Sequence, residues 1–472
     1  MGKAMNTAAN SRGTVNRETY LKHLLTQAAA AADESFLGLK ELRDRAIALV
    51  GEQAFPSKRD EEWRFTDLSA MLDLPFQRAK RSSDAASQLM ASPAFLEHLQ
   101  LFSEGHCFVS LNGHMVPNTP QGAEKSESDH SLSFPEGAIV GPLSQLLKKS
   151  DYAERLEPIL AKRLAQVQGG GEVFTALNTA GFSDVMVVWL PADTRLDAPV
   201  CLVRATQGDQ ISYARTLVIA ERHANLTLVE SFSSAQDGAG SGDDVDSHSR
   251  CNNSVTEIWL EEGAKVNHVR LQDEGKGTFH IGKTAVSQAA NSQYICTSVD
   301  LGAQLSRHHL EVYQAGPQTD TQLYGVSALR DRQLADTHSL LTLTHPHGSA
   351  TQIQKNIVDD RAHSVFNGKV YVSQDAQLTD ASQLNRNLML SSKARVDTKP
   401  ELDIVADNVK CAHGATVSQL QADEVFYLQS RGISAEQAQR LLLYGFAMEI
   451  VDKISLAPLR ASLSDRLNQW AR

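Results

Sequence analysis

The stretch GSATQIQKNIVDDRAHSVFNGKVYVSQDAQLTDASQLNRNLMLSSKARV, residues 348–396, contains the pattern that decides the fold. In this stretch a turn residue is followed by alanine and then by alternating polar and apolar residues. The alternation predicts short β-strands. The pattern occurs at GSATQI (348–353), QDAQL (374–378) and SKARV (392–396), and again at EGAKV (262–266), LGAQL (301–305) and HGATV (413–417). Such recurrence predicts a β-solenoid, in which each coil buries its apolar face against its neighbours.

The alanines of this repeat give an expected coil length. They are residues 264, 303, 350, 376, 394 and 415, so the successive gaps are 39, 47, 26, 18 and 21 residues. The last three gaps suggest single coils of roughly 20 residues, and the first two suggest double coils. A β-sandwich is the alternative arrangement for the same strands.

The chain divides into three regions by the period of its apolar residues. Helical stripes at 18–32, 39–51 and 142–167 predict a helical N-terminal region over 1–180, with loops such as 81–88. Short β-branched runs predict a β-helix core over 181–418, interrupted by an acidic, Gly/Ser-rich loop at 233–250. Residues 419–472 predict a helical C-terminal region, in which Ser434 and Gln437 form a capping box.

Composition limits the possible partners and compartment. The formal net charge of -11 argues against nucleic-acid or anionic-membrane binding. No apolar run approaches the roughly 20 residues needed to span a bilayer. The five cysteines form no C-x-x-C pair, which suits a reducing compartment. We expect a cytoplasmic protein; plastid stroma is the alternative, because the Asn/Thr/Ser-rich N-terminus leaves an organelle presequence open.

The segment GTFHIGKT (277–284) matches the phosphate-loop pattern G-x-x-x-x-G-K-[ST]. A working phosphate loop follows a buried strand and opens a helix, whose N-terminal amides hold the phosphates. Here the preceding residues resemble a turn, no helical stripe follows, and Phe279, His280 and Ile281 alternate as in a strand. We therefore interpret the segment as a strand beside a glycine turn and expect this chain to bind no ATP.

Cys411 and His413 form the clearest candidate metal site. Their spacing in DNVKCAHGATVSQL (407–420) puts both side chains on the same face of a strand. Thiol and imidazole are suitable ligands for iron, zinc or an iron–sulfur cluster. Two ligands leave a site incomplete, so the others would come from elsewhere. A buried cysteine beside a hydrogen-bonded histidine is the structural alternative.

The same residues carry a family resemblance. FNGKVYVSQDAQLTDASQLNRNLMLSSKARVDTKPELDIVADNVKCAHGATVSQL (366–420), followed by FYLQSRGISAEQAQRLLLYGFAMEIV (426–451), resembles the SufB/SufD family of iron–sulfur cluster assembly proteins. Further matching stretches are PSKRDEEWRFTDL (56–68), ALNTAGF (176–182), FHIGKTAVSQ (279–288) and LGAQLSRHHLEV (301–312). Cys411 ahead of His413-Gly414-Ala415-Thr416, together with EWRFT (62–66), is more similar to the SufD branch than to SufB.

This resemblance implies a fold, partners and a cargo. The fold would be a right-handed parallel β-helix between helical regions. The chain would be a non-catalytic scaffold subunit that pairs with a SufB-type scaffold and binds a SufC-type ATPase, which holds the ATP. A transient, nascent cluster would form at the SufB–SufD interface, with His413 as ligand or interface residue and Cys411 beside it. The residues implied in partner binding are Phe426, Tyr427, Arg431, Gly432 and Phe446.

A β-helix carbohydrate-active enzyme is the alternative function. That chemistry needs clustered carboxylates together with arginine or lysine on one solenoid face. Asp359, Asp360, Arg361 and Asp397 supply such side chains, although no arrangement is evident from their spacing.

Overall fold

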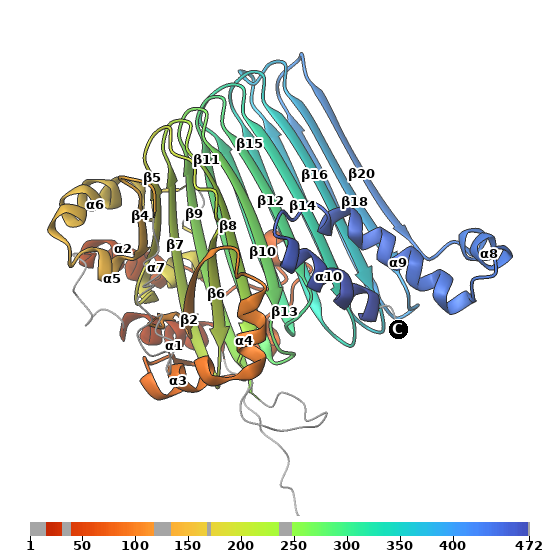
Figure 1. Ribbon diagram of the computed structural model, residues 1–472, viewed down its shortest axis with the longest axis horizontal. Helices are drawn as coiled ribbons and strands as arrows, with labels where there is room; N and C mark the ends of the chain where they lie inside the picture. The colour runs from red at the N-terminus through yellow and green to blue at the C-terminus, as the bar shows by residue number, and fades with distance from the viewer. Residues whose placement is uncertain (1–15, 31–38, 118–133, 168–170, 236–247, 471–472) are drawn as a thin grey trace, which may run out of the picture.

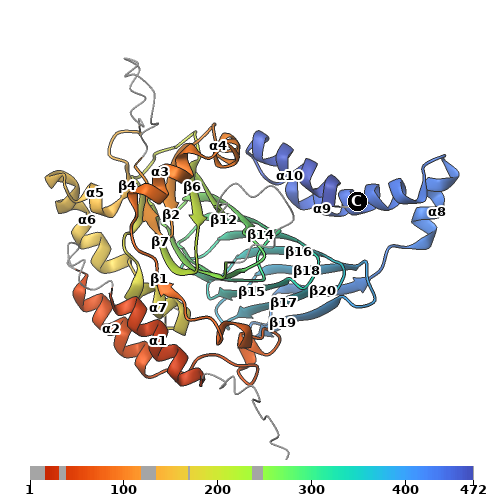
Figure 2. The ribbon, with the colours of Figure 1, turned by 90° about the horizontal axis from the view of Figure 1, so that it is seen from below.

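The computed structural model describes residues 16–30, 39–117, 134–167, 171–235 and 248–470. Its centre is a parallel β-helix with helices around its first coils and a second group of C-terminal helices that lies along one face of the solenoid and extends beyond its last coil (Figures 1 and 2). The solenoid prediction is confirmed, and the sandwich alternative is wrong. Within the described part of the chain, none of the helices is long and apolar enough to cross a membrane.

The first strands precede or open the solenoid. They are β1 (Gln77–Arg78), β2 (His106–Leu111), β3 (His114–Met115), β4 (Ile139–Pro142), β5 (Met186–Leu190), β6 (Val200–Thr206), β7 (Gln210–Ala220) and β8 (Asn225–Ser234). The remaining strands complete the stack. They are β9 (Arg250–Leu260), β10 (Lys265–Asp273), β11 (Thr278–Gln288), β12 (Gln293–Asp300), β13 (Leu305–Gln314), β14 (Asp320–Leu329), β15 (Leu334–Leu343), β16 (Ser349–Val358), β17 (His363–Val372), β18 (Asp380–Met389), β19 (Arg395–Ile404) and β20 (Lys410–Ser418).

Each coil of the solenoid contributes one strand to each of two sheets. The odd-numbered sheet has the order β19-β17-β15-β13-β11-β9-β7-β5-β4, with β1 beside β7. The even-numbered sheet has the order β20-β18-β16-β14-β12-β10-β8-β6-β2-β3. From β5 onward the neighbouring strands of each sheet pair in parallel. The last strands, β19 and β20, therefore end the stack with one unpaired edge each.

The coil length differs from the sequence prediction. In the even-numbered sheet Asp320 pairs with Ser349, Ser349 with Asp380 and Asp380 with Lys410, steps of 29, 31 and 30 residues. The predicted coil of roughly 20 residues is wrong because the repeated alanines occupy unequal positions. Ala394 precedes a strand of the odd-numbered sheet, whereas Ala415 lies inside a strand of the even-numbered one.

The interior of the solenoid has an apolar half. Inward side chains from successive coils stack there into one hydrophobic cluster, which includes Val218, Ile258, Val286, Val312, Leu341 and Val370. Each coil shields only part of this column, so the column is continuous only when the coils are stacked. Burial of apolar surface along the stack supplies the main driving force for the fold.

The other half of the interior is polar and charged. Glu230 accepts hydrogen bonds from Arg204 Nη2 (3.1 Å) and His268 Nε2 (3.2 Å). Burial lowers the pKa of His268, but hydrogen bonds with Cys296 and Glu230 outweigh burial and raise the pKa to about 9. Burial alone would raise the pKa of Glu230, yet the bond from His268 and the charge of Arg204 hold it well below its usual range. The buried charges are thus paired, as their desolvation requires.

The N-terminal helices cover the outer face of the odd-numbered sheet and the start of the even-numbered one. They are α1 (Arg17–Ala29), α2 (Lys40–Gly51), α3 (Ser83–Ala91), α4 (Pro93–Gln100), α5 (Leu143–Leu146), α6 (Ser150–Arg163) and α7 (Val173–Gly181), with short 3-10 turns η2 (Glu61–Trp63) and η3 (Ser69–Met71). Leu24, Val50 and Phe174 join Phe279 and Leu305 of the sheet in one core. Strands β1 to β4 also come from residues 1–180, so this region is not purely helical.

Three helices follow the last strand: α8 (Ala422–Ser430), α9 (Ala435–Val451) and α10 (Ala457–Trp470). Leu443, Ala447 and Ile450 of α9 pack on the outer face of the even-numbered sheet, against Val326 and Ile357. The predicted capping box is confirmed, because Ser434 Oγ accepts from the Gln437 amide (3.2 Å) while Gln437 Oε1 accepts from the Ser434 amide (3.4 Å). Helix α8 projects away from the solenoid (Figures 1 and 2).

Some predicted loops are corrected or lie outside the described residues. Residues 81–88 were expected to form a loop, but Ser82 accepts a hydrogen bond from the Ala85 amide (3.2 Å) and begins α3. Of the acidic loop 233–250, the ends belong to β8 and β9, and residues 236–247 lie outside the described residues. The N-terminal residues 1–15 lie outside them as well.

The GTFHIGKT segment forms the start of β11, which confirms the strand interpretation. Gly282 and Lys283 pair with His308 and His309 of β13 inside the sheet. The Lys283 ammonium is nearly buried on the outer face and donates to Glu311 (2.8 Å). A turn and then β12 follow, so the helix N-terminus on which a phosphate loop depends does not follow this segment.

We predict that Lys283→Ala lowers the stability of the fold, because it leaves the Glu311 carboxylate with His309 alone, at 3.1 Å. The expected loss is about 1–3 kcal/mol in the free energy of unfolding, measured by urea titration. Lys276→Ala is the matched control, since Lys276 pairs with Asp331 at the exposed surface and should cost under about 1 kcal/mol. An unchanged midpoint for Lys283→Ala would contradict a structural role for this lysine.

Candidate functional site

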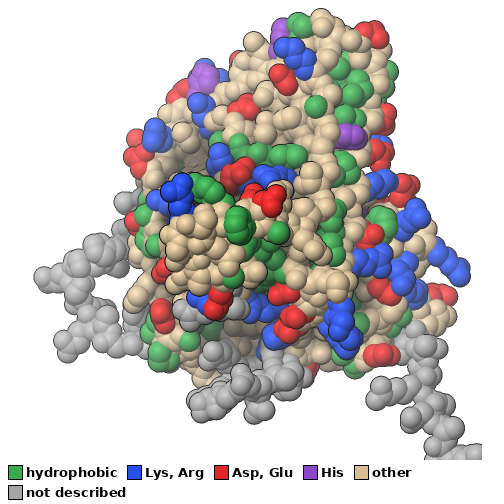
Figure 3. All heavy atoms as spheres, turned by 90° about the vertical axis from the view of Figure 1, so that its right-hand side faces the viewer, with side chains coloured by type: hydrophobic (Ala, Val, Ile, Leu, Met, Phe, Trp, Pro, Cys, Tyr) green, Lys and Arg blue, Asp and Glu red, His purple; other side chains and the backbone are tan. Residues whose placement is uncertain are grey.

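The candidate site lies at the open end of the solenoid, where none of the described residues forms a further coil on the one made by β19 and β20. Figure 3 looks onto this end of the molecule. Most side chains of β20 are exposed, and those of β19 are half-buried or exposed. Leu384, Ile404, Val405 and Val417 are among the exposed large hydrophobic residues of the chain, and all four belong to the last coils.

Cys411 and His413 lie on the inward face of this last coil. In the ladder between β18 and β20, Cys411 pairs with Ala381 and His413 pairs with Gln383. Ala381 and Gln383 are buried inside the solenoid. Because paired residues in neighbouring strands point to the same side of a sheet, Cys411 and His413 also point inward. The prediction that they share a face is therefore confirmed.

The two side chains differ in their surroundings. Cys411 is half-buried and packs against the apolar interior, together with Leu402 and Val409. Burial raises the pKa of its thiol. His413 is exposed, and we find no hydrogen-bond partner for it among the described residues. A group arriving at the open end would therefore meet His413 first.

Two unsatisfied polar atoms lie in the same region. Gln383 is 3 % exposed and donates to Gln352 Oε1 (2.8 Å), but its own Oε1 has no hydrogen-bond partner in the described part of the chain. Thr398 Oγ1 on β19 is likewise buried without a partner there. A buried polar atom without a partner costs free energy. The end of the solenoid thus offers hydrogen-bonding capacity that a bound group can use.

The residues present suit only part of a metal or cluster site. Within the described ranges, no three His, Cys, Asp or Glu side chains come close enough together to hold an ion. Cys411 and His413 provide soft and borderline ligands on one face, and Gln383 Oε1 lies on the adjacent strand. A complete coordination shell here would need ligands from a second protein.

The backbone edge of β20 is open to pairing. Lys410 donates to the carbonyl of Thr379 (2.8 Å), so the even-numbered residues of β20 direct their backbone groups toward β18. Since direction alternates along a strand, Cys411, His413, Ala415 and Val417 direct their amides and carbonyls away from the sheet. Apart from Lys410, β20 has no charged side chain and no proline.

The edge of β19 is protected by comparison. Arg395 donates to the carbonyl of Ala362 (2.9 Å), so the even-numbered residues of β19 face the open edge. One of them is Pro400, which has no amide hydrogen to offer. Charged side chains also line this strand: Lys399 pairs with Glu61 (2.7 Å) and Lys369 with Asp403 (3.3 Å). Proline and charge are common ways to block edge pairing, so β20 is the more available edge.

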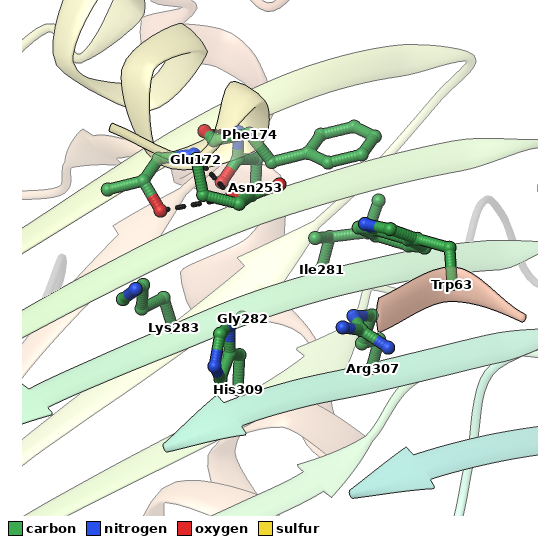
Figure 4. Close-up of a pocket in the computed structure, with 10 residues that line it drawn as sticks. Trp63, Glu172, Phe174, Asn253, Ile281, Gly282, Lys283, Arg307 and His309 are labelled. Atoms are coloured by element: carbon green, nitrogen blue, oxygen red, sulfur yellow. Dashed lines mark hydrogen bonds between the residues drawn. The ribbon is translucent and has the colours of Figure 1, made fainter. Parts of the chain in front are cut away.

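The segment 56–68 reaches this end from the N-terminal region. Trp63 is buried and stacks on the Arg307 guanidinium at 4.0 Å from the ring centroid (Figure 4). Thr66 hydrogen bonds Asp336 of β15, and Glu61 pairs with Lys399 of β19. The cavity beside Trp63 measures about 10 Å³, enough for one water molecule. This segment therefore packs against the sheet, and the described residues beside Trp63 leave no pocket large enough for a substrate.

The predicted partner-binding residues fall into two groups. Phe426 and Tyr427 on α8 are 70 % and 59 % exposed, and Arg431 lies over the Tyr427 ring at 5.4 Å. Gly432 ends this helix with a left-handed φ of 86°. Phe446 differs, because it packs on the solenoid with Lys355 at 4.5 Å from its ring.

Beyond α8, a groove of 560 Å³ opens between α9 and α10, lined in part by Leu441 and Tyr444.

The three carboxylates considered for carbohydrate cleavage have local structural partners, whereas Arg361 lines an open hollow of about 720 Å³ together with Asp360. Asp360 accepts from the Asp331 amide (3.0 Å) and Asp359 from the Asp360 amide (2.7 Å), so both hold turns. Asp397 accepts from His363 (2.7 Å) and pairs with Arg395 (2.7 Å). The enzyme alternative therefore gains no support from this geometry.

Family models match nearly the whole chain. The model described as "SUF system FeS cluster assembly, SufBD core domain" matches residues 203–446, and "SufBD protein N-terminal region" matches residues 14–202. The chain belongs to the SufBD family. SufBD membership confirms the resemblance and supports a role in iron–sulfur cluster assembly by the SUF system.

Similar proteins come from bacteria and plants. The chain is 42 % identical to "Iron-sulfur cluster assembly SufBD family protein slr0076" of Synechocystis sp., over 94 % of this chain and 93 % of that protein. It is 32 % identical to "Protein ABCI7, chloroplastic" of Arabidopsis thaliana, over 93 % and 88 %. It is 28 % identical to "Iron-sulfur cluster assembly protein SufD" of Escherichia coli, over 77 % and 84 %.

The sequence named Cys411 and His413 as candidate residues but gave no indication of Gln383, Thr398 or Pro400. These residues matter because they adjoin the last strand in space. Only the pairing of β18 with β20, 30 residues apart, brings Gln383 beside His413. The sequence around Gln383, DASQLNRN, carries no signal that separates it from other inward-facing polar residues.

Proposed function

We propose that this SufBD family chain is a non-catalytic scaffold subunit of a SUF complex that pairs with a SufB-type scaffold through the open end of its solenoid. One observation carries the proposal. The last coil presents an unprotected strand edge together with inward-facing ligands, and a solenoid otherwise needs another layer to cover such a coil.

In this proposal the partner adds a strand to β20. Strand addition joins main-chain amides and carbonyls, so it needs a free, flat edge with few charges. The outward backbone groups at Cys411, His413, Ala415 and Val417 provide that edge. Exposed Val417 and Leu384 would be buried in the same contact, which adds an apolar contribution.

A nascent iron–sulfur cluster is the cargo of the interface. His413 would supply one ligand, Cys411 would lie beside it, and the SufB-type partner would complete the set. Gln383 Oε1, which has no partner among the described residues and belongs to the residue paired with His413, would accept a hydrogen bond from the imidazole of a ligating His413, since ligating histidines generally donate their second nitrogen to an acceptor. The cluster would be transient, because two ligands from this chain are too few to retain it alone.

The C-terminal helices would bind a SufC-type ATPase, which holds the ATP. The support is the position of α8, which projects from the solenoid and exposes Phe426 and Tyr427. Gly432 and Arg431 fix the end of that helix, and Phe446 anchors α9 to the sheet behind it. A movement of the ATPase would then be transmitted to the even-numbered sheet through α9, which packs on β14 and β16.

The three predicted regions have separate tasks in this scheme. Residues 181–418 carry scaffold pairing, residues 419–472 carry ATPase docking, and residues 1–180 cover the sheets. We assign the chain to the cytoplasm, with plastid stroma as the alternative because one relative is named chloroplastic.

We predict that His413→Asn loses the cluster without losing the complex. The chain would be co-purified anaerobically with SufB-type and SufC-type partners, and iron, labile sulfide and visible absorbance would be measured. Removing a ligand should lower bound iron and sulfide by roughly tenfold or more. His347→Asn is the matched control, because His347 is exposed at a turn with a φ of 62°, which asparagine tolerates. Undiminished iron in an intact His413→Asn complex would assign the ligands to the partner.

We predict that Ala415→Pro prevents pairing with the SufB-type scaffold. Proline removes an outward amide, while the bonds of β20 to β18 use the neighbouring even-numbered residues. Size-exclusion chromatography with the partner should show loss of the heterodimer, while the thermal midpoint of the isolated chain stays within a few degrees. Val396→Pro is the control on β19, whose edge Pro400 already interrupts. If Val396→Pro abolished the heterodimer and Ala415→Pro did not, the interface would lie at β19 instead.

We predict that Phe426→Ala with Tyr427→Ala weakens ATPase binding by about 10- to 100-fold, as expected for exposed aromatic anchors. Binding of the SufC-type subunit would be measured by calorimetry. The thermal midpoint of the variant should match the wild type, because both rings are largely exposed. Leu96→Ala on α4 is the control, since Leu96 is 43 % exposed but far along the chain from α8. Equal affinities for all three proteins would place the docking surface elsewhere.

A further inference from the structure

Cys107 and Cys201 lie side by side on neighbouring strands, far in the sequence from Cys411. In the parallel ladder between β2 and β6, Cys107 pairs directly with Cys201. Adjacent strands lie about 4.8 Å apart, and disulfides join residues whose Cα atoms are about 4.4–6.8 Å apart. The pair occupies the second step of the ladder, close to the beginning of both strands, where small backbone adjustments are least restrained.

The two side chains lie on the same side of the sheet, because they are paired residues of neighbouring strands. Both side chains join the cluster under α3 and α4, with Val109 and Val203. The sulfur of Cys201 lies close to the backbone just before β2, because a Cβ atom placed on Gly105 would approach it to 2.5 Å. The Cys107 thiol lies 3.2 Å from the carbonyl oxygen of Phe102, on the same stretch of chain. No disulfide joins the two cysteines in the structure.

We propose that Cys107 and Cys201 form a reversible intramolecular disulfide, made by exchange with a low-molecular-weight disulfide such as oxidised glutathione. The site is independent of the open end of the solenoid and of the partners assigned to it. It would fasten β2, and with it α3 and α4, to β6 of the solenoid, across the 108–200 segment of the chain.

The exchange proceeds in two steps. The Cys107 thiol loses its proton, and the thiolate attacks one sulfur of the small disulfide and releases the first small thiolate. Cys201 then loses its proton and attacks the Cys107 sulfur, which releases the second small thiolate. The two protein thiols are oxidised by two electrons, the small disulfide is reduced to two thiols, and the two protons end on those thiols.

The environments of the two cysteines support this order. Cys107 is half-buried, whereas Cys201 is fully buried, so a small disulfide would react with Cys107 first. A hydrogen bond from Cys201 lowers the pKa of Cys107, and the same bond together with burial raises the pKa of Cys201. The less buried thiol is therefore also the more easily ionised one, as the attacking thiol should be.

The test uses the full chain in a glutathione redox buffer. Samples are quenched with an alkylating reagent and digested without reduction, and the peptides are mapped by mass spectrometry. We expect a linked peptide pair containing Cys107 and Cys201, which disappears on reduction. In the Cys201→Ser variant, the exchange should instead stop after its first step, with Cys107 in a mixed disulfide with glutathione. Cys411→Ser should leave the linked pair unchanged.

A wild-type chain whose Cys107 remains a thiol, or stops as the mixed disulfide, would overturn the proposal. Thermal unfolding gives a second measure that does not depend on peptide recovery. The oxidised wild type should melt several degrees above the reduced one, because a cross-link over a long loop restricts the unfolded chain. That difference should vanish in Cys201→Ser, and a difference that persists there would also overturn the proposal.

Discussion

The backbone hydrogen bonds between successive coils are the constraint on which the rest of this structure depends. Each coil satisfies its amides and carbonyls only through the coils before and after it. The first coils are covered by helices and by the strands β2 to β4. The last coil has no such cover, so the same ladder that holds the solenoid together ends in an unsatisfied edge. The candidate site exists because the stack stops there.

The two terminal strands meet this constraint differently. Pro400 and the charged side chains of β19 protect one edge, while the uncharged run from Cys411 to Ser418 leaves the other available. In the proposed complex, protection of one edge and exposure of the other would give the partner a single orientation in which to add its strand. Specificity of assembly would then follow from edge chemistry as much as from side-chain contacts.

The polar half of the interior sets a second condition on assembly. Inward-facing charges near Glu230 and His268 are paired with one another within the stack. Buried polar atoms without a hydrogen-bond partner among the described residues occur along the stack, from Arg204 Nε beside Glu230 to Gln383 Oε1 and Thr398 Oγ1 in the last coils. Those of the last coils lie beside the proposed interface, where a bound partner would relieve their cost.

The sequence by itself determined the solenoid, the strand nature of GTFHIGKT, the capping box at Ser434 and the shared face of Cys411 and His413. The last three depend on alternation or spacing over a few residues, which local backbone geometry fixes, and the solenoid was predicted from the recurrence of one such local pattern along the chain. The tertiary structure decided the coil length, the edge status of β20, the position of Gln383 beside His413 and the meeting of Cys107 with Cys201. Those depend on register between strands 30 to 94 residues apart. Register is set by how whole coils stack and how long their turns are, and no local pattern in the chain records it.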